Sequence, residues 1–425
     1  MHHVVQSFAT TALIQLVGLA NAVLLARILG PEGRGELALV LLYPVLALGL
    51  IGMAMSDAVV YRAAKGVAPQ RLAPTVLLLA LAAGLVAFAA GWLVVPILLA
   101  GHDPAVVRSG LVYFLMVPAG LAGLYLGGVF QGRLEYGAWN AIRAATTIAT
   151  ATAVAGLVLL GLAEVASVTL AYLAGFCLSA ALALLLARRR GWLAARPDGR
   201  EVGAILRFAA PLQLGVLVQL VNERLDQLLI AHLLTPTDLG LYVAAMAIAI
   251  IPSIPAVTLA SVAYPRIAGV AEAADRGPVV ERYVRLAAAL AGVIALLLLA
   301  AADRLVALLY GPEFAPAVPI LAWYAAGAVA LAMRAVLAQA VKASGRPGLA
   351  MLAELAGLAV NIVLLLVLLP RVGVAGAAMA YAGMQATVLA LLTIAAVRVA
   401  GFRPGRLVRD TPREVADQMR RLAQL

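Results

Sequence analysis

Two short polar stretches interrupt an otherwise apolar chain: RILGPEGRGELALV at residues 27–40 and HLLTPTDLGLYVAA at residues 232–245. Each carries a proline after a long apolar run and a glycine four residues further on. Proline cannot continue the preceding helix, glycine permits a turn, and Glu36 or Asp238 suits the positive start of the next helix. We predict that each stretch is a structural elbow joining two helices.

The composition indicates an integral membrane protein. The chain has 425 residues, of which 64% are hydrophobic and only 12% charged, and its mean hydropathy is +1.03. A soluble domain carries roughly 25% charged residues. Apolar runs recur along nearly the whole length, long enough to cross about 30 Å of hydrocarbon as helices. They are continuous and rich in Ala and Leu, without the alternation of transmembrane strands.

The polar breaks predict an all-α membrane protein with about twelve transmembrane helices. These cover residues 4–26, 36–61, 72–99, 109–131, 136–160, 164–187, 204–232, 238–265, 282–302, 316–341, 348–370 and 372–397. With a cytoplasmic N-terminus, 23 of the 31 Lys and Arg residues lie in inner loops or the tail, as the positive-inside rule requires. We therefore expect both termini in the cytoplasm. The net charge of +11 then reflects topology and contact with anionic lipids, and not nucleic-acid binding.

The two elbows belong to a longer internal repeat. A shift of 205 residues places Pro31 on Pro236 and Gly35 on Gly240, and weaker matches follow along both halves. Six spans per half is an even number, so both halves enter the membrane from the same side and the repeat is parallel. The predicted organisation is an N-terminal six-helix bundle (1–187), a basic cytoplasmic linker (188–203), a C-terminal six-helix bundle (204–397) and a cytoplasmic tail (398–425).

The end of the tail, TPREVADQMRRLAQL at residues 411–425, has a capping-box start and apolar residues on one helical face. It predicts either an amphipathic helix on the membrane surface or a solvated tail. Prolines inside the spans, among them Pro252 and Pro255, predict kinks.

The sequence also resembles a known family. The stretches that carry the likeness are LLARILGPEGRGELALVLLYP, NERLDQLLIAHLLTPTDLGLYVAAMAIAIIPSIPAVTLASVAYPRIAG, LYGPEFAPAVPILAWYA and KASGRPGLAMLAELAGLAVNIVLLLVLLPRVGVAGAAMAYA. In this order they resemble polysaccharide-biosynthesis (O-antigen or exopolysaccharide) flippases of the multidrug/oligosaccharidyl-lipid/polysaccharide (MOP) exporter superfamily. The resemblance implies a V-shaped pair of bundles in the bacterial cytoplasmic membrane. It also implies alternating-access transport of a polyprenyl-diphosphate-linked oligosaccharide from the inner to the outer leaflet.

A polar stripe marks the seventh predicted span. Gln219, Asn222, Glu223 and Asp226 stand at i, i+3, i+4 and i+7 and therefore share one helical face. Asn222 and Asp226 match the N-x-x-x-D element of the resembled family, whereas Glu223 departs from its pattern. The stripe is interpreted as a cavity wall that binds sugar hydroxyls or takes up a proton, or as a buried hydrogen-bonded patch between helices.

Four arginines are candidates for binding the diphosphate. Arg143, Arg224 and Arg334 lie inside predicted spans, and Arg27 lies near the outer mouth. Guanidinium groups pair bidentately with phosphate oxygens, and a diphosphate crossing the hydrocarbon needs such compensation. Arg224 is two residues from Asp226, the wrong spacing for an intrahelical ion pair. Its partner is therefore expected on another helix or at the lipid interface.

Candidate ion-coupling residues are Glu223, Asp226, Asp57 and Glu354, because a carboxylate in an apolar setting can take up a proton near neutral pH. Asp57 lies near the cytoplasmic end of its span, where an ion pair with Arg62 or another basic group is the simpler interpretation. Glu354 has Asn361 seven residues later on the same face, which makes it the stronger candidate.

Two other function classes remain as alternatives. A multidrug or cation exporter of the same superfamily would favour an acidic cavity, and a membrane glycan polymerase or glycosyltransferase would need a large outer loop, whereas all outer loops here are short. The four scattered histidines and the lack of a zinc-protease or phosphate-loop motif argue against an enzyme, a metal site or a cofactor. The expected partners are a polyprenyl-diphosphate-linked glycan and membrane lipids, with a glycan polymerase left open.

Overall fold

The computed structural model describes residues 2–270 and 273–407, and every regular element in that part of the chain is a helix. By contacts the chain divides into two compact units, Met1–Gly240 and Leu241–Leu425. Unit 1 contains seven helices and the start of an eighth. They are α1 (His2–Ala64), α2 (Pro69–Leu98), α3 (Pro104–Tyr113), α4 (Met116–Gly132), α5 (Tyr136–Leu159), α6 (Val165–Arg189), α7 (Gly199–Leu233) and α8 (Pro236–Ala249).

Unit 2 holds the rest of α8 and the remaining helices. These are η1 (Ile251–Ser253), α9 (Ile254–Ala268), α10 (Ala273–Ala300), α11 (Ala302–Leu309), η2 (Pro312–Phe314), α12 (Ala317–Ala343), α13 (Pro347–Val372), α14 (Val374–Ala400) and η3 (Pro404–Arg406). Within this unit α12 packs against α9, α10 and α14, and α13 packs against α14.

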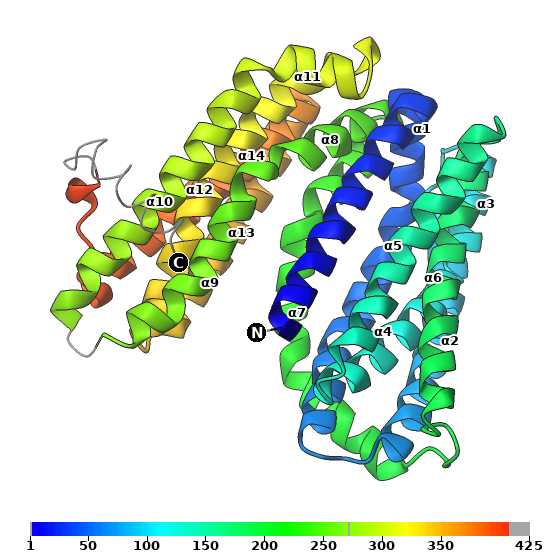
Figure 1. Cartoon of the computed structure of the whole chain (residues 1–425). Helices are drawn as coiled ribbons and strands as arrows, with labels where there is room; N and C mark the ends of the chain where they lie inside the picture. Colours follow the sequence, from blue (N-terminus) through cyan, green and yellow to red (C-terminus); the bar gives the residue numbers. More distant parts are fainter. Residues whose placement is uncertain (1, 271–272, 408–425) are drawn as a thin grey trace. The chain divides into compact units, whose positions relative to one another are not determined.

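The first elbow folds α1 back on itself. Gly30 has φ 68° and ψ −178°, a conformation that glycine adopts without a steric penalty, and Pro31 then starts the second arm. Figure 1 shows α1 rising from the N-terminus and turning back near its label. Leu25 and Leu37 lie in one buried cluster with Val154, although twelve residues of straight helix would span about 18 Å. The predicted elbow is confirmed here.

The second elbow joins α7 to α8 through Leu234 and Thr235. Leu234 is extended. The Thr235 hydroxyl accepts from the Asp238 backbone N–H at 3.2 Å, and the Asp238 carboxylate accepts from the Thr235 backbone N–H at 3.2 Å. This reciprocal capping satisfies donors that a helix start leaves unpaired. The prediction that Asp238 suits the helix start is thus confirmed with a specific geometry.

The two elbows touch each other inside unit 1. A Cβ at Gly35 would lie 1.6 Å from the Pro236 carbonyl oxygen, and a Cβ at Gly240 would lie 1.8 Å from the Pro31 carbonyl oxygen. The contact is reciprocal, because each glycine packs against the carbonyl oxygen of the first helical residue of the other elbow. Both positions therefore need glycine for close backbone approach and not for a turn.

Eleven segments of the described chain are long and apolar enough to cross a membrane. The first, Ala9–Ala64, has 56 residues and includes the Gly30 elbow, so it covers residues 9–26 of the predicted span 4–26 and all of the predicted span 36–61. The twelve-helix count stays a prediction.

Two predicted spans are interrupted. Residues 238–265 form α8, η1 and α9, because Pro252 lacks the amide hydrogen that a continuous helix requires. Residues 109–131 divide between α3 and α4 at Phe114 and Leu115. The short helix α11 was not predicted. The tail helix predicted from Thr411 lies outside the described residues.

The boundary between the units differs from the predicted linker. Contacts place the division after Gly240 and not at 188–203, because α7 packs against α1. The Leu220 side chain fills the space beside Gly49, where a Cβ would come within 2.8 Å of it, and the Gln213 amide donates to the Leu50 carbonyl at 2.6 Å. The six-helix repeat remains a prediction about sequence, whereas the compact unit includes a seventh helix.

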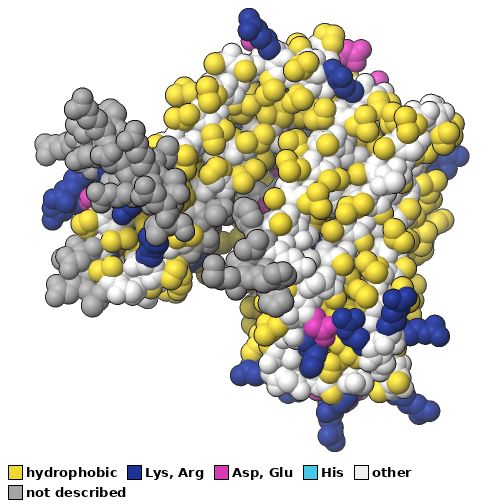
Figure 2. All heavy atoms as spheres, in the orientation of Figure 1, with side chains coloured by type: hydrophobic (Ala, Val, Ile, Leu, Met, Phe, Trp, Pro, Cys, Tyr) yellow, Lys and Arg dark blue, Asp and Glu magenta, His cyan; other side chains and the backbone are white. Residues whose placement is uncertain are grey.

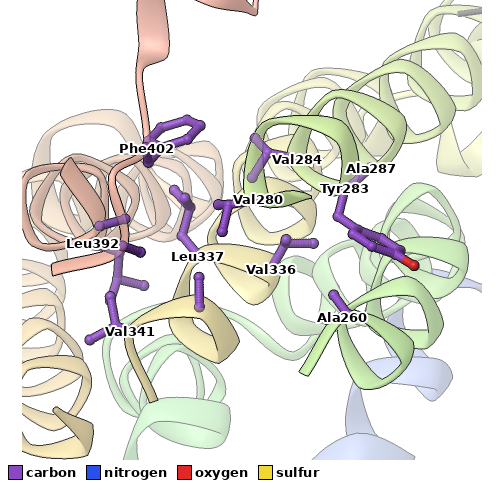
Figure 3. Packing of buried hydrophobic residues seen from close by; sticks show 14 of the residues in the cluster. Ala260, Val280, Tyr283, Val284, Ala287, Val336, Leu337, Val341, Leu392 and Phe402 are labelled. Atoms are coloured by element: carbon purple, nitrogen blue, oxygen red, sulfur yellow. The ribbon is translucent and has the colours of Figure 1, made fainter. Parts of the chain in front are cut away.

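Small residues allow close helix packing in unit 2. A buried cluster joins α9, α10, α12 and α14 and consists largely of Ala and Val (Figure 3). A Cβ at Gly327 would lie 2.6 Å from the Tyr381 ring, and one at Gly357 would lie 2.2 Å from Val388. Because lipid tails are as apolar as side chains, such helices associate through packing and not through exclusion of water.

Basic side chains gather at one end of unit 1, and hydrophobic side chains cover the surface above them (Figure 2). Arg62 at the end of α1 binds Glu201 in the first turn of α7 at 2.7 Å, and Arg71 binds Asp198. These ion pairs fasten the start of α7 to α1 and α2.

Candidate functional site

The stripe on α7 runs from an exposed to a buried position. Gln219 and Glu223 are exposed, and the Gln219 amide donates to the Glu223 carboxylate at 2.9 Å. Asn222 is half-buried, and its Oδ1 has no hydrogen-bond donor among the described residues. Asp226 is only 7% exposed, and its carboxylate accepts from the Gln227 backbone N–H at 2.7 Å. Along one helix, α7 thus presents the exposed Gln219–Glu223 pair, the Asn222 oxygen without a described donor and the buried Asp226.

Arg224 does not have the partner that the sequence predicted. Its guanidinium donates to the Gln227 side-chain oxygen on the same helix at 3.2 Å. The prediction of a partner on another helix or at the lipid interface is wrong, because it considered only Asp226 at i+2. Gln227 at i+3 lies on the neighbouring turn and is within reach.

Arg143 lies on α5 against the first arm of α1. Its guanidinium stacks over the Trp139 ring at 4.4 Å from the centroid and donates to the Thr11 hydroxyl at 3.5 Å. One turn earlier, the Asn140 amide donates to the Ser7 hydroxyl at 3.1 Å, while its Oδ1 has no donor among the described residues. Arg143 thus has one long hydrogen bond and one ring contact, and no acid among the described residues neutralises it.

Arg334 and Glu354 form a buried network in unit 2. Arg334 on α12 is 9% exposed; it donates to the Gln385 side-chain oxygen on α14 and forms an ion pair with Glu354 on α13. The Glu354 side chain is 36% exposed, whereas that of Arg334 is 11% exposed. Sequence reasoning placed Arg334 with the substrate and Glu354 with the coupling ion, but the structure joins them through three helices.

The expected pair of Asp57 with Arg62 does not form. Arg62 binds both carboxylate oxygens of Glu201, at distances of 2.7 to 2.9 Å. Asp57 is exposed and makes no ion pair among the described residues. The Arg62 prediction is wrong because Glu201, 139 residues away, is brought to it by the packing of α7 on α1. Arg27 lies exposed near the end of the first arm of α1.

Sequence reasoning missed three polar residues that complete these groups. Glu201 and Asp198 are the two acids of the basic linker 188–203. Two acids in an otherwise basic segment could have indicated that they form ion pairs. Gln385 is 2% exposed, and its position inside the last apolar run was the signal for it. None of the described residues forms a group of three His, Cys, Asp or Glu side chains suited to a metal ion.

The fold is that of a known class of membrane proteins. A solved structure of the lipid II flippase MurJ in an inward closed conformation is similar with a TM-score of 0.76 and 14% identity, covering 95% of this chain and 89% of that chain. An inward-facing multidrug resistance MATE family transporter of the MOP superfamily is similar with a TM-score of 0.68 and 14% identity, covering 91% and 95%. A structure of the eukaryotic MATE transporter AtDTX14 is similar with a TM-score of 0.54 and 14% identity, covering 93% of this chain and 96% of that chain. The chain thus has the fold of the MOP superfamily.

The family follows from the sequence comparison. The model of the family described as polysaccharide biosynthesis protein matches residues 4–271, more than half of the 425 residues. The chain belongs to this family, and the predicted resemblance is confirmed. A search of the curated proteins finds no match.

Proposed function

We propose that the protein is a flippase that moves a polyprenyl-diphosphate-linked oligosaccharide from the inner to the outer leaflet of the bacterial cytoplasmic membrane by alternating access. Membership of the polysaccharide biosynthesis family supports a glycan substrate. The fold it shares with a lipid II flippase supports a lipid-linked one. A glycan polymerase that takes up the product is the corresponding partner.

The observation that carries the proposal is the network around Arg334. A permanently charged side chain inside a transmembrane helix is costly and is retained where it binds substrate or a partner charge. Gln385 fixes the guanidinium from one side, while the more exposed Glu354 binds it from the other. Glu354 therefore occupies the place that a phosphate oxygen would take, since carboxylate and phosphate use the same guanidinium geometry.

This arrangement gives an exchange mechanism. When Glu354 is ionised it neutralises Arg334, and when it takes up a proton Arg334 is free to bind the diphosphate. Loss of that proton on the other side of the membrane would restore the pair and release the lipid. Glu354 is thus the principal coupling residue in this proposal, with Glu223, Asp226 and Asp57 as further candidates.

The remaining predicted site residues have supporting roles in the proposal. Arg143, Arg224 and Arg27 provide additional positive charge along the path of the diphosphate. Gln219, Asn222 and Asp226 bind sugar hydroxyls, and the unused Oδ1 of Asn222 is an acceptor suited to that purpose. In this proposal the chain makes twelve membrane passages, with the two arms of α1 counted separately, and both termini lie in the cytoplasm, as the distribution of basic residues favours.

The test is substrate retention by the purified protein in native mass spectrometry. The protein would be offered a polyprenyl-diphosphate oligosaccharide beside a lipophilic cationic drug. We expect Arg334→Gln to reduce retention of the diphosphate lipid by at least about tenfold, the scale of a lost charge-assisted contact. Arg371→Gln, at the end of α13 in the same unit, is the matched control and should retain the lipid.

A second variant tests the exchange mechanism. Glu354→Gln removes the competing carboxylate and should increase diphosphate-lipid retention while abolishing the dependence of transport in vesicles on a proton gradient. Retention of the cation alone, unaffected by Arg334→Gln, would contradict the flippase proposal and favour a multidrug exporter. Such an exporter would use the buried Asp226.

A further inference from the structure

A cavity of about 370 Å³ lies in unit 2, between the end of α9 and the first turns of α10. Its lining consists of Arg266 from α9 and Pro278, Val279, Arg282 and Tyr283 from α10. The cavity belongs to neither the α7 stripe nor the Arg334 network. It combines two cationic side chains with an apolar wall and one phenol.

The two cavity arginines have no acceptor in the part of the chain that the structure describes. Their neighbours on α10 are engaged: the Arg276 guanidinium donates to the Val270 carbonyl at 3.0 Å, and Arg285 donates to the Arg406 carbonyl at 3.2 Å. Arg266 and Arg282 thus bring to one cavity two charges that no described acid neutralises. An anion would relieve their repulsion and use donors that are otherwise left to solvent.

Glu281, the acid that directly precedes Arg282 in sequence, is turned elsewhere. Glu281 is 5% exposed; its carboxylate accepts from the Arg403 backbone N–H at 3.1 Å and lies 4.0 Å from the Arg406 guanidinium. It therefore holds the segment after α14 and does not neutralise Arg282.

Tyr283 adds a donor to the two guanidinium groups. Its ring packs beside Ala260, and its hydroxyl points away from the hydrophobic cluster (Figure 3). Two guanidinium forks and a phenol suit the oxygens of a phosphate group. Pro278 and Val279 give the same cavity an apolar side.

We propose that this cavity binds the phosphate of an anionic phospholipid headgroup. A lipid is favoured over a soluble anion by the surroundings. α10 contains a candidate membrane span, Arg276–Ala300, and α9 exposes Val262 and Tyr264, each 43% exposed, within four residues of Arg266 in sequence. Basic residues at the cytoplasmic end of transmembrane helices attract anionic lipids, and an aromatic residue at that level is typical of the interface.

The experiment compares lipid retention by native mass spectrometry for the whole protein in detergent. Phosphatidylglycerol and phosphatidylcholine with the same acyl chains are the probes, and inorganic phosphate is a separate arm. We expect one tightly retained phosphatidylglycerol on the unmodified protein. The double variant Arg266→Gln/Arg282→Gln should retain about tenfold less, because two charge-assisted donors are lost.

The matched control is Arg188→Gln/Arg189→Gln, which removes the same charge from exposed positions of α6 outside the cavity. It should retain phosphatidylglycerol normally. Tyr283→Phe keeps the ring that packs on Ala260 and should reduce retention about twofold to threefold, as expected for one neutral hydrogen bond. This variant decides the question if the double variant is not recovered as folded protein.

Equal losses in the cavity and control variants would overturn the proposal, because the effect would then be one of net charge. Unchanged retention in Tyr283→Phe together with the double variant would also overturn it. Displacement of the lipid by millimolar inorganic phosphate would show a site for soluble anions and contradict the lipid assignment.

Discussion

The two units use one helical position in opposite ways. The eighth residue of α5 in unit 1 is Arg143, and the eighth residue of α13 in unit 2 is Glu354. Arg143 contacts Trp139 and the Thr11 hydroxyl and no acid in the part of the chain that the structure describes. Glu354 binds a guanidinium supplied by α12. The eighth residue of α5 is therefore a cation without an acid partner among the described residues, whereas the eighth residue of α13 is half of an ion pair.

The two elbows, in contrast, share one close contact although their turns differ in backbone conformation. Gly35 and Gly240 each pack against the backbone carbonyl of the first helical residue of the other elbow. Positions where backbones meet leave no room for change, whereas a side chain that faces a polar cavity or lipid can change sign. Division of labour between the units is thus expected at α5 and α13 and not at the elbows.

The largest effect is expected from a methyl group at the elbow contact. Gly35→Ala and Gly240→Ala each place a Cβ within 1.8 Å of a backbone oxygen, so one helix must move away. We expect a loss of about 3 kcal/mol or more, the upper end of overpacking effects, measured as thermal stability in detergent. Gly215→Ala on α7, where no atom lies within 4 Å of the added Cβ, should leave stability unchanged or raise it. Similar losses in all three variants would show that the contact is unimportant.

Replacing Arg334 in unit 2 should cost more stability than replacing Arg143 in unit 1. Arg334→Leu leaves the Gln385 oxygen buried without a donor and Glu354 without its counter-charge, a cost of about 1–3 kcal/mol. Arg143→Leu loses a cation–π contact of about 0.5–1 kcal/mol and a long hydrogen bond. Both variants gain from placing leucine in the membrane, so the difference between their melting temperatures measures the network.

An exchange of charges sharpens that comparison. The double variant Arg334→Glu/Glu354→Arg keeps an ion pair and should recover part of the stability that either single substitution loses, because paired sites are not additive. If the double variant loses as much stability as the two single variants lose in sum, direct pairing would be contradicted.

A smaller effect is expected where α7 meets α1. Glu201→Gln weakens the bidentate bond between the Glu201 carboxylate and Arg62. The Glu201 side chain is 5% exposed and that of Arg62 is 28% exposed. We expect a loss of about 1–2 kcal/mol, the range for hydrogen bonds to charged groups in partly buried sites, measured by thermal unfolding. Asp57→Asn makes the same chemical change at an exposed position and should have no measurable effect. If both variants lose stability equally, general surface charge would be the cause.

The smallest effect should appear only in acid. The Arg71 guanidinium and the Arg200 backbone N–H both bind Asp198 and hold the pKa of that carboxyl below its usual value of 3.8. A lowered pKa in the folded state means that the pair stabilises above that usual value and that the stabilisation is lost as the pH falls through the lowered pKa. Asp198→Asn should therefore be slightly less stable at neutral pH and equal to the unmodified protein in strong acid. A difference that persists in acid would exclude the ion pair as its cause.

Sequence alone determined the membrane class, both elbows and the positions of most helices, although α10 begins nine residues before its predicted start at 282 and α11 was not predicted. These properties depend on local composition: long apolar runs must form helices in lipid because every backbone group needs a partner. Pro31 and Pro236 mark turns for equally local reasons. The charged residues inside spans were also found from sequence alone, because charge stands out against an apolar background, whereas the neutral Gln385 was missed.

Only the tertiary structure decided which of these residues meet. Glu201 reaches Arg62 across 139 positions, Gln385 reaches Arg334 across 51, and Gly35 meets the elbow that contains Gly240. Helical periodicity specifies the face on which a side chain lies but not the helix that packs against that face. Pairing is set by the close packing of small residues between helices, so partners far apart in sequence became visible only in the folded chain.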